Sequence, residues 1–271
     1  MPELPEVETS RRGIEPHIMN KKVTDVIIRR KNLRWTIPVI MKKQLIGQKI
    51  IKVDRRGKYI LLQTSAGSVI LHLGMSGSLR ILKKSVAAEK HDHFDIVFSN
   101  NKVLRLRDPR RFGAVLWSKS DPLKHKLLIN LGPEPLNDEF NAEYLYEVSR
   151  SRKVAIKTFL MNSNIVVGVG NIYANESLFA AGINPKRAAN KISLKSYQNL
   201  VPKIKAILKK SIEQGGTTLK DFINEDGKPG YFQQTLCVYG RDSEPCINCG
   251  KLIKQITQAQ RSTFYCSTCQ K

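Results

Sequence analysis

MPELPEVE (residues 1–8) opens the chain, and the first predicted helix begins within it. The stretch is too polar and too acidic for a signal peptide, which needs a basic start and an apolar run. Its Pro5-Glu6 pair is typical of a helix start, because proline at the first helical position loses no needed donor and acids favour the positive helix N-terminus. The pattern predicts a helix over residues 6–15, which Pro16 would end.

Pro2 and Glu3 precede that helix and are candidates for covalent chemistry. Removal of the initiator Met1, which small second residues usually permit, would make Pro2 the terminal residue. An α-amino group is much less basic than a lysine amine, so part of it is unprotonated at neutral pH and can attack an electrophilic sugar carbon. The product would be a charged iminium, a strong electron sink, with Glu3 beside it as an acid or base. The alternative is that both residues only begin a helix.

Composition favours a folded, nucleic-acid-binding protein. The 271 residues are enough for two domains, and the hydrophobic content of 41% fits a globular chain. Lys and Arg number 46 against 23 for Asp and Glu, a net charge of +23. Such an excess indicates a polyanionic partner, most often nucleic acid. A membrane surface is the other candidate, but the sequence contains no apolar run of transmembrane length and no lipidation motif.

The first half of the chain reads as an antiparallel β-sandwich or barrel. Short strand-like runs are separated by turn residues at regular spacing. The turn-rich segment 131–135 is the expected domain boundary. The predicted strands cover residues 23–30, 49–53, 59–63, 69–73, 78–82, 93–98, 103–107 and 114–117.

The second half is predicted to be helical, followed by a short β ribbon from residue 236. Asp138 should cap the first of these helices and Ser193 the last, and Pro202 should kink or split the last one. Residues 224–230 are polar and glycine-rich and read as a mobile loop. The fold class is therefore α+β, with expected domains 1–133, 134–235 and 236–271. The predicted helices cover residues 139–149, 153–162, 171–181 and 193–214.

The cysteines carry a strong metal signature. The spacing Cys246-x2-Cys249-x16-Cys266-x2-Cys269 matches a two-knuckle zinc site, in which four thiolates close a tetrahedron. The sequence supplies four ligands and no fifth, so we expect one structural Zn²⁺ with no open catalytic position. Cysteines used in this way also indicate a reducing compartment. The alternative is unpaired or redox-active thiols. Cys237 is left over and reads as a packed thiol.

Two turns, the first of them flanked by glycines, carry apolar side chains. Met75 lies in the turn 73–77, and Phe112 follows two arginines in the turn 108–113. An enzyme that acts on a duplex base must extrude it, and an apolar wedge with an arginine can fill the gap. The alternative is that Met75 and Phe112 are ordinary core residues.

Four further residues are weaker candidates. Lys58 opens an apolar strand and could approach a phosphate or carry a proton, although a lone lysine is usually only surface. Arg261 should lie near the tip of a hairpin between the cysteine pairs, where it could contact a phosphate or remain solvated. His91 and His93 have no third metal ligand nearby in the sequence, so a phosphate or structural contact is the better interpretation.

Taken together, these motifs resemble the bacterial formamidopyrimidine-DNA glycosylase family. The resemblance runs from end to end and is carried by residues 1–8, 72–77, 90–93, 108–113, 131–135 and 168–173 and by the zinc ribbon. It implies a bifunctional glycosylase and AP lyase for oxidised purines, chiefly 8-oxoguanine and ring-opened purines. It also implies a β-sandwich, a helix-two-turn-helix module and a C-terminal zinc finger.

The resemblance also implies catalytic roles. Pro2 corresponds to the Schiff-base nucleophile and Glu3 to the general acid in base release. Lys58 and Arg261 correspond to the proton donors of the β- and δ-eliminations. This chemistry requires that Met1 be cleaved from the active protein.

DNA contacts follow from the same resemblance. His91, Arg110 and Arg152 match the family's DNA contacts. Relatives carry lysine where Arg152 stands. Both side chains are cations, so the difference affects only whether the side chain can bind a phosphate in a bidentate manner. Met75 and Phe112, with Arg110, resemble the residues that fill the gap left by the flipped base.

Two further positions belong to the second half of the chain. Asn171 resembles the phosphate-gripping asparagine of the two-turn motif, and Glu176 a residue on the base side. Residues 221–233 resemble the loop that covers the extruded base.

Two rival functions remain open. Endonuclease VIII-type glycosylases for oxidised pyrimidines share the fold, the proline and the zinc finger, but Leu4 and the 108–113 turn favour the purine enzyme. A non-catalytic zinc-ribbon protein that recognises damaged DNA would not need a processed Pro2-Glu3 terminus. The expected partner is double-stranded DNA containing oxidised purines or abasic sites. The protein is expected to be a monomer in the bacterial cytoplasm, with no membrane association.

Overall fold

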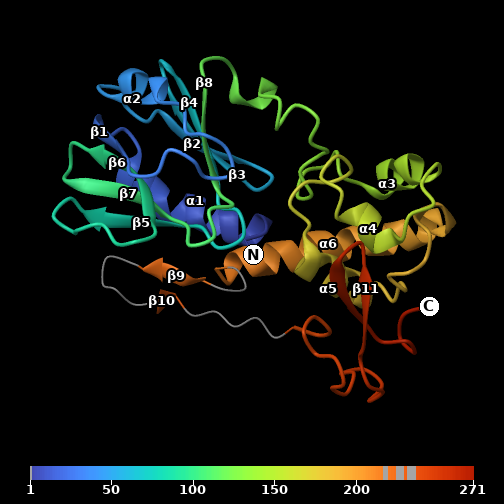
Figure 1. Ribbon diagram of the computed structural model, residues 1–271. Helices are drawn as coiled ribbons and strands as arrows, with labels where there is room; N and C mark the ends of the chain where they lie inside the picture. The colour runs from blue at the N-terminus through green and yellow to red at the C-terminus, as the bar shows by residue number, and fades with distance from the viewer. Residues whose placement is uncertain (1, 216–218, 224–228, 231–235) are drawn as a thin grey trace. The chain divides into compact units, whose positions relative to one another are not determined.

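The computed structural model describes residues 2–215, 219–223, 229–230 and 236–271 (Figure 1). They form two compact units, the first from Met1–Asn130 and Gly215–Gln233, the second from Leu131–Gln214 and Gln234–Lys271. The fold is α+β, as predicted, and each unit has its own hydrophobic core. The exact domain limits expected from the sequence stay a prediction.

Helix α1 (Leu4–Ile18) opens the first unit. The side chains of Glu3 and Glu6 form a capping box, in which the Glu3 N–H donates to the Glu6 carboxylate over 2.8 Å. Pro16 lies inside the helix and does not end it, which corrects the expected boundary. The helix continues because Ile14 and Ile18 are both fully buried in the sandwich core.

Two four-stranded antiparallel sheets make the predicted sandwich. The strand order is β1-β6-β7-β5 in one sheet and β2-β3-β4-β8 in the other, and apolar side chains of both sheets join one core with α1. The short helix α2 (Ile40–Leu45) and the 3₁₀ turn Pro122–Lys124 were not predicted. The strands are β1 (Val23–Ile28), β2 (Lys52–Arg56), β3 (Tyr59–Thr64), β4 (Gly67–His72), β5 (Ser78–Lys83), β6 (Asp92–Phe98), β7 (Lys102–Arg107) and β8 (Ala114–Ser118).

A further strand pair belongs to the first unit. Strands β9 (Leu219–Ile223) and β10 (Pro229–Gly230) are antiparallel, and β9 lies against β5. The segment expected to cover the extruded base, residues 221–233, therefore begins in β9, and much of it lies outside the described residues. The expected mobile loop at 224–230 also lies largely outside them.

The second unit is helical up to the ribbon. It contains α3 (Ala142–Ser149), α4 (Ile156–Leu160), α5 (Asn171–Ala180), a 3₁₀ turn (Ala189–Lys191) and α6 (Leu194–Glu213). Asn141, not Asp138, caps α3, since its side chain accepts from the Tyr144 N–H. Ser193 caps α6 as predicted.

Helix α6 runs through Pro202 without a break, so the predicted split is wrong. An internal proline costs a helix about 3 kcal/mol. Here the opposing contribution comes from Tyr197, Leu200, Ile204 and Leu208, all fully buried on one face of α6. No helix among the described residues is both long and apolar enough to cross a membrane.

A two-stranded ribbon completes the second unit. Strands β11 (Lys254–Gln258) and β12 (Arg261–Tyr265) pair antiparallel, with Gln258 opposite Arg261. Ala259 and Gln260 both have positive φ, of 46° and 59°, the geometry of a tight two-residue hairpin turn. Arg261 thus lies at the hairpin tip, as predicted.

Candidate functional site

The N-terminal candidates lie at the start of helix α1. Pro2 is partly buried directly ahead of the helix, and Glu3, at its N-cap, is only 1% exposed. Met1 lies outside the described residues. The positive end of the helix dipole faces this site, an environment that favours neutral or anionic groups over additional cations.

A buried carboxylate attaches helix α1 to the β2–β3 hairpin. Glu8 accepts from Arg11, Arg12 and Arg55, the last over 3.0 Å, and Arg55 also donates to the carbonyl of Gly57. Burial alone would raise the pKa of Glu8. The hydrogen bonds and charges of these arginines outweigh burial and lower the pKa of Glu8 to about 2.

Lys58 lies in the turn of that same hairpin. The Tyr59 ring packs on His72, with ring centroids 4.8 Å apart. Burial, followed by the positive charges of Lys58 and Arg34, lowers the pKa of His72 to about 4. Tyr59 pairs with His72 across β3 and β4, so Lys58, the residue before Tyr59, lies beside the end of β4, where the turn carrying Met75 begins.

The two wedge candidates are surface residues. Met75 is 41% exposed and Phe112 is 44% exposed, so the alternative that they are core residues is wrong. The Arg110 guanidinium lies over the Phe112 ring, 5.1 Å from its centroid. Exposed apolar side chains beside a cation fit insertion into a base stack better than they fit a solvated loop.

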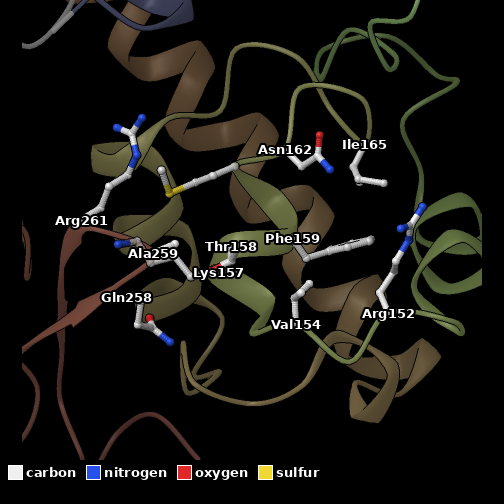
Figure 2. A pocket seen from close by; sticks show the side chains of 11 residues that line it. Arg152, Val154, Lys157, Thr158, Phe159, Asn162, Ile165, Gln258, Ala259 and Arg261 are labelled. Carbon is white, nitrogen blue, oxygen red and sulfur yellow. The ribbon is translucent and has the colours of Figure 1, made fainter.

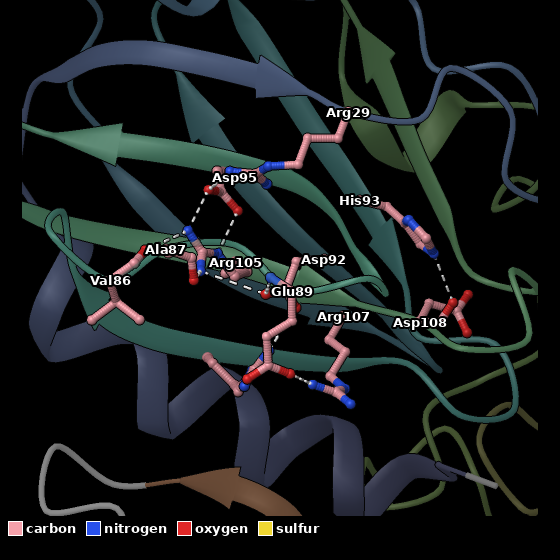
Figure 3. Close-up of polar contacts among 11 residues, drawn as sticks. Arg29, Val86, Ala87, Glu89, Asp92, His93, Asp95, Arg105, Arg107 and Asp108 are labelled. Carbon is pink, nitrogen blue, oxygen red and sulfur yellow. Dashed lines mark hydrogen bonds and ion pairs between the residues drawn. The ribbon is translucent and has the colours of Figure 1, made fainter.

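The segment leading to His91 is fixed to the sheet by a buried ion network (Figure 3). Arg105 pairs with Asp95 over 2.9 Å and donates to the carbonyls of Val86 and Ala87. Asp92 accepts from Arg80 over 2.6 Å. His91 is thereby held at the start of β6. Its expected contact with a phosphate stays a prediction.

The two arginine candidates of the second unit, Arg152 and Arg261, line one cavity. A cavity of about 400 Å³ has Arg152 on one side and Arg261 on the other (Figure 2). Asn162 and Lys157 also line it. Two arginines that flank a hollow can bind phosphate oxygens.

Polar side chains from two helices hold the ribbon hairpin. The Lys157 ammonium, 1% exposed, donates to the Ser262 carbonyl over 2.8 Å and to the Thr263 hydroxyl over 2.7 Å. The Asn171 amide donates to the same Ser262 carbonyl over 3.0 Å. The residue beside Arg261 is therefore anchored to α4 and α5. Lys157 was not among the predicted site residues, because the only signal in the sequence is a lysine within an apolar helical pattern.

Glu176 binds backbone within its own unit. Its carboxylate, 6% exposed, accepts three N–H groups, from Cys237, Val238 and Tyr239, over 2.8 to 2.9 Å. These contacts fix the chain directly after the segment expected to cover the base. Glu176 therefore anchors the backbone of residues 237–239 to helix α5.

The four predicted metal ligands converge. The sulfurs of Cys246, Cys249, Cys266 and Cys269 all lie within 4.8 Å of one another, and two pairs are 3.5 and 3.9 Å apart. Tetrahedral Zn–S bonds of about 2.3 Å place sulfurs roughly 3.8 Å apart, so the site fits one structural Zn²⁺. Cys237 packs against the ribbon core and is not part of the cluster, as predicted.

Each unit thus contains part of the candidate set. Pro2, Glu3 and Lys58 lie in the first unit with His91 and the wedge residues, and Arg261 lies in the second with the other phosphate contacts and the zinc site. A β-sandwich that carries Pro2 and Glu3, followed along the chain by a helical module and a four-cysteine ribbon, is the architecture expected of a DNA-repair glycosylase.

Comparison with known proteins identifies the family. Family models match the formamidopyrimidine-DNA glycosylase N-terminal domain over residues 1–115, its H2TH domain over 131–223, and the zinc finger found in FPG and IleRS over 243–271. A formamidopyrimidine-DNA glycosylase of Shewanella halifaxensis is 57% identical over 271 residues, covering all of both chains. The chain belongs to the formamidopyrimidine-DNA glycosylase family.

Solved structures agree with this assignment. Lactococcus lactis Fpg (MutM) in complex with DNA containing N7-benzyl-Fapy-dG matches with a TM-score of 0.91 and 34% identity over all of both chains. The same protein in complex with abasic-site DNA matches with a TM-score of 0.89 and 34% identity, again over all of both chains.

Proposed function

We propose that this chain is a bifunctional DNA glycosylase and AP lyase of base excision repair that removes 8-oxoguanine and formamidopyrimidines from duplex DNA. The observation that carries the proposal is the full-length family match of a chain in which Pro2 and Glu3 stand at the start of helix α1. The relatives crystallised with Fapy-dG and abasic-site DNA support the same substrate class.

Base release is assigned to the first two residues of the processed chain. The unprotonated nitrogen of Pro2 attacks C1′ of the damaged nucleotide. The glycosidic bond breaks, its electron pair leaves with the base, and Glu3 supplies a proton to the departing base or to the sugar. The Pro2 nitrogen then loses its proton, the C1′–O4′ bond breaks, and O4′ keeps the electron pair and takes up a proton. A C1′=N⁺ iminium on Pro2 remains.

Strand cleavage follows from that iminium. The positive nitrogen acidifies the C2′ hydrogens, and loss of one of them expels the 3′ phosphate by β-elimination. A second elimination expels the 5′ phosphate, which leaves a one-nucleotide gap. We assign Lys58 and Arg261 as the proton donors of these two steps.

The remaining candidates are assigned to DNA binding. His91, Arg152 and Asn171 contact the backbone, where phosphate contacts fix register without reading sequence. Met75 and Phe112, with Arg110, fill the gap left by the extruded base.

Glu176 acts on the base side indirectly, through the backbone that it holds at residues 237–239. The zinc ribbon presents Arg261. The enzyme works as a monomer on DNA in the cytoplasm.

The test is product analysis on defined duplexes. One set carries 8-oxoguanine opposite cytosine and a matched set carries thymine glycol opposite adenine. We expect release of the free oxidised purine and a gap with phosphate at both ends. A clear preference for the oxidised pyrimidine would assign the endonuclease VIII type. Binding without any released base would assign a non-catalytic damage-recognition protein.

A further inference from the structure

Asp108 joins the three segments that carry the DNA-contact candidates of the first unit. Its side chain is fully buried. One carboxylate oxygen accepts from the Ser76 hydroxyl over 2.9 Å and the other from the Gly113 N–H over 2.7 Å. Ser76 follows Met75 and Gly113 follows Phe112, so a single carboxylate links the two turns that carry the wedge side chains.

The backbone of Asp108 links the same site to strand β6. Its N–H donates to the carbonyl of His91 over 3.0 Å, and the Nε2 of His93 donates to the carbonyl of Asp108 over 2.9 Å (Figure 3). The Arg111 N–H donates to that carbonyl as well, over 3.2 Å. The position of His91 is therefore coupled to the position of the 108–113 turn.

The two wedge turns also meet directly. The Arg110 N–H lies 3.3 Å from the Ser76 hydroxyl oxygen. Gly74 has a φ of +64°, and a Cβ there would lie 2.4 Å from the carbonyl carbon of Phe112. Only glycine permits so close an approach. The turns form one unit whose shape depends on the bonds to Asp108.

Burying a carboxylate costs free energy unless its oxygens are hydrogen-bonded. Both oxygens of Asp108 are hydrogen-bonded, and both bonds come from the wedge turns. We propose that Asp108 is a positioning residue that holds Met75, Arg110 and Phe112 in a preformed wedge and keeps His91 in register with it. Preorganisation matters because a wedge that must be ordered during base extrusion loses binding energy to conformational entropy. The proposal rests on the proposed function, in which these residues fill the gap left by the flipped base.

The experiment compares variants on two substrates under single-turnover conditions. The first substrate is a duplex with 8-oxoguanine paired with cytosine, and the second has the same lesion in a small bubble of mismatched bases. The variants are Asp108→Asn, which keeps the volume, and Ser76→Ala, which removes one donor from a partly exposed residue. Asp121→Asn is the control, an exposed acid of the same unit whose carboxylate also accepts a backbone N–H.

Asp108→Asn and Ser76→Ala should slow excision of the paired lesion by about tenfold or more, because each weakens a hydrogen bond to the buried side chain of residue 108. Excision from the bubble should change by less than about threefold, since the base there needs little help to leave the stack. The control should match wild type on both substrates.

The double variant that combines Asp108→Asn with Met75→Ala gives a second readout, which a simple loss of stability would not produce. If Asp108 acts through the wedge, Asp108→Asn should cost clearly less in a Met75→Ala background than in wild type, because one of the side chains that it positions is then missing. Equal losses on both substrates, full additivity, or no loss on the paired lesion would overturn the proposal. A wild-type enzyme that excises 8-oxoguanine from neither substrate would instead show that the proposed function itself is wrong.

Discussion

Pro2 and Glu3 are neighbours in the chain, but the proposed chemistry gives them separable tasks. Pro2 supplies the nucleophile for every covalent step. Glu3 supplies a proton that is needed only while the base is still attached to the sugar. An abasic site has already lost its base and is in equilibrium with an open aldehyde, with which Pro2 can condense unaided.

Glu3→Gln should therefore lose most 8-oxoguanine excision, by about 10²- to 10⁴-fold, the usual contribution of general acid catalysis. Cleavage of a preformed abasic site should largely survive. Single-turnover rates on the two substrates measure this difference, with thermal melting as the control because Glu3 also caps α1. If the folded variant lost both activities equally, Glu3 would have to serve the eliminations too.

Some residue roles were readable from the sequence and others were not. The zinc ligands and the hairpin position of Arg261 follow from spacing alone, which is local. The contacts of Asp108 and Lys157 were not predicted, because each depends on segments that only the folded chain brings together. A buried polar residue gives no signal in a single sequence apart from its neighbours' hydrophobicity.

At the scale of elements, the sandwich was predicted closely because its strands are short apolar runs that end at turn residues. Prediction failed where tertiary packing overrode local preference. Pro16 and Pro202 both lie inside helices whose apolar faces are buried. Helix α2 was missed because its six residues are too short to show a period.

The attachment of α1 to the β2–β3 hairpin should make the first unit sensitive to acid. The pKa of Glu8 is lowered from 4.5 to about 2 in the folded protein. The ionised carboxylate therefore adds its full contribution to the free energy of unfolding above about pH 5, and this contribution is lost as the pH falls toward 2. The loss should reach at most about 3 kcal/mol. Both tryptophans, Trp35 and Trp117, lie in the first unit, so their fluorescence follows its unfolding selectively.

Urea unfolding of wild type at pH 6 and pH 3 measures this effect. Glu8→Gln should lower the free energy of unfolding at pH 6. It should also reduce the difference between the free energies of unfolding at pH 6 and pH 3. Asp121→Asn should keep the wild-type difference. A Glu8→Gln variant with the full wild-type pH dependence would show that the Glu8 contacts do not stabilise the unit.

The zinc ribbon should be a separable element. Cys249→Ser removes an exposed ligand and should release the zinc and unfold the ribbon, since such sites fold on metal binding. Tryptophan-detected unfolding of the first unit should not change. DNA affinity should fall roughly tenfold, because the ribbon presents Arg261 and a charged hydrogen bond contributes about 1.5–3 kcal/mol.

Cys237→Ser is the matched control for the zinc site, because this thiol lies outside the cluster. It should retain one zinc per chain by elemental analysis and bind DNA as wild type does. Loss of zinc from this variant, or its retention in Cys249→Ser, would contradict the assigned ligand set.

At the scale of the whole molecule, the net charge of +23 should dominate DNA affinity. If about five phosphates are neutralised, the logarithm of the binding constant should fall with the logarithm of salt concentration with a slope of about −4 to −5. Fluorescence anisotropy between low and physiological salt measures the slope. A slope near zero would mean that the basic surface does not bind the DNA backbone.

The most direct test of the account is covalent trapping on Pro2. The enzyme is incubated with a duplex containing 8-oxoguanine opposite cytosine in the presence of borohydride, which reduces an iminium to a stable amine. The adduct is then digested and its peptides are mapped by mass spectrometry. We expect one DNA adduct per chain, on the N-terminal peptide, at Pro2, with Met1 absent. An adduct on a lysine, or efficient excision by a chain that retains Met1, would contradict it.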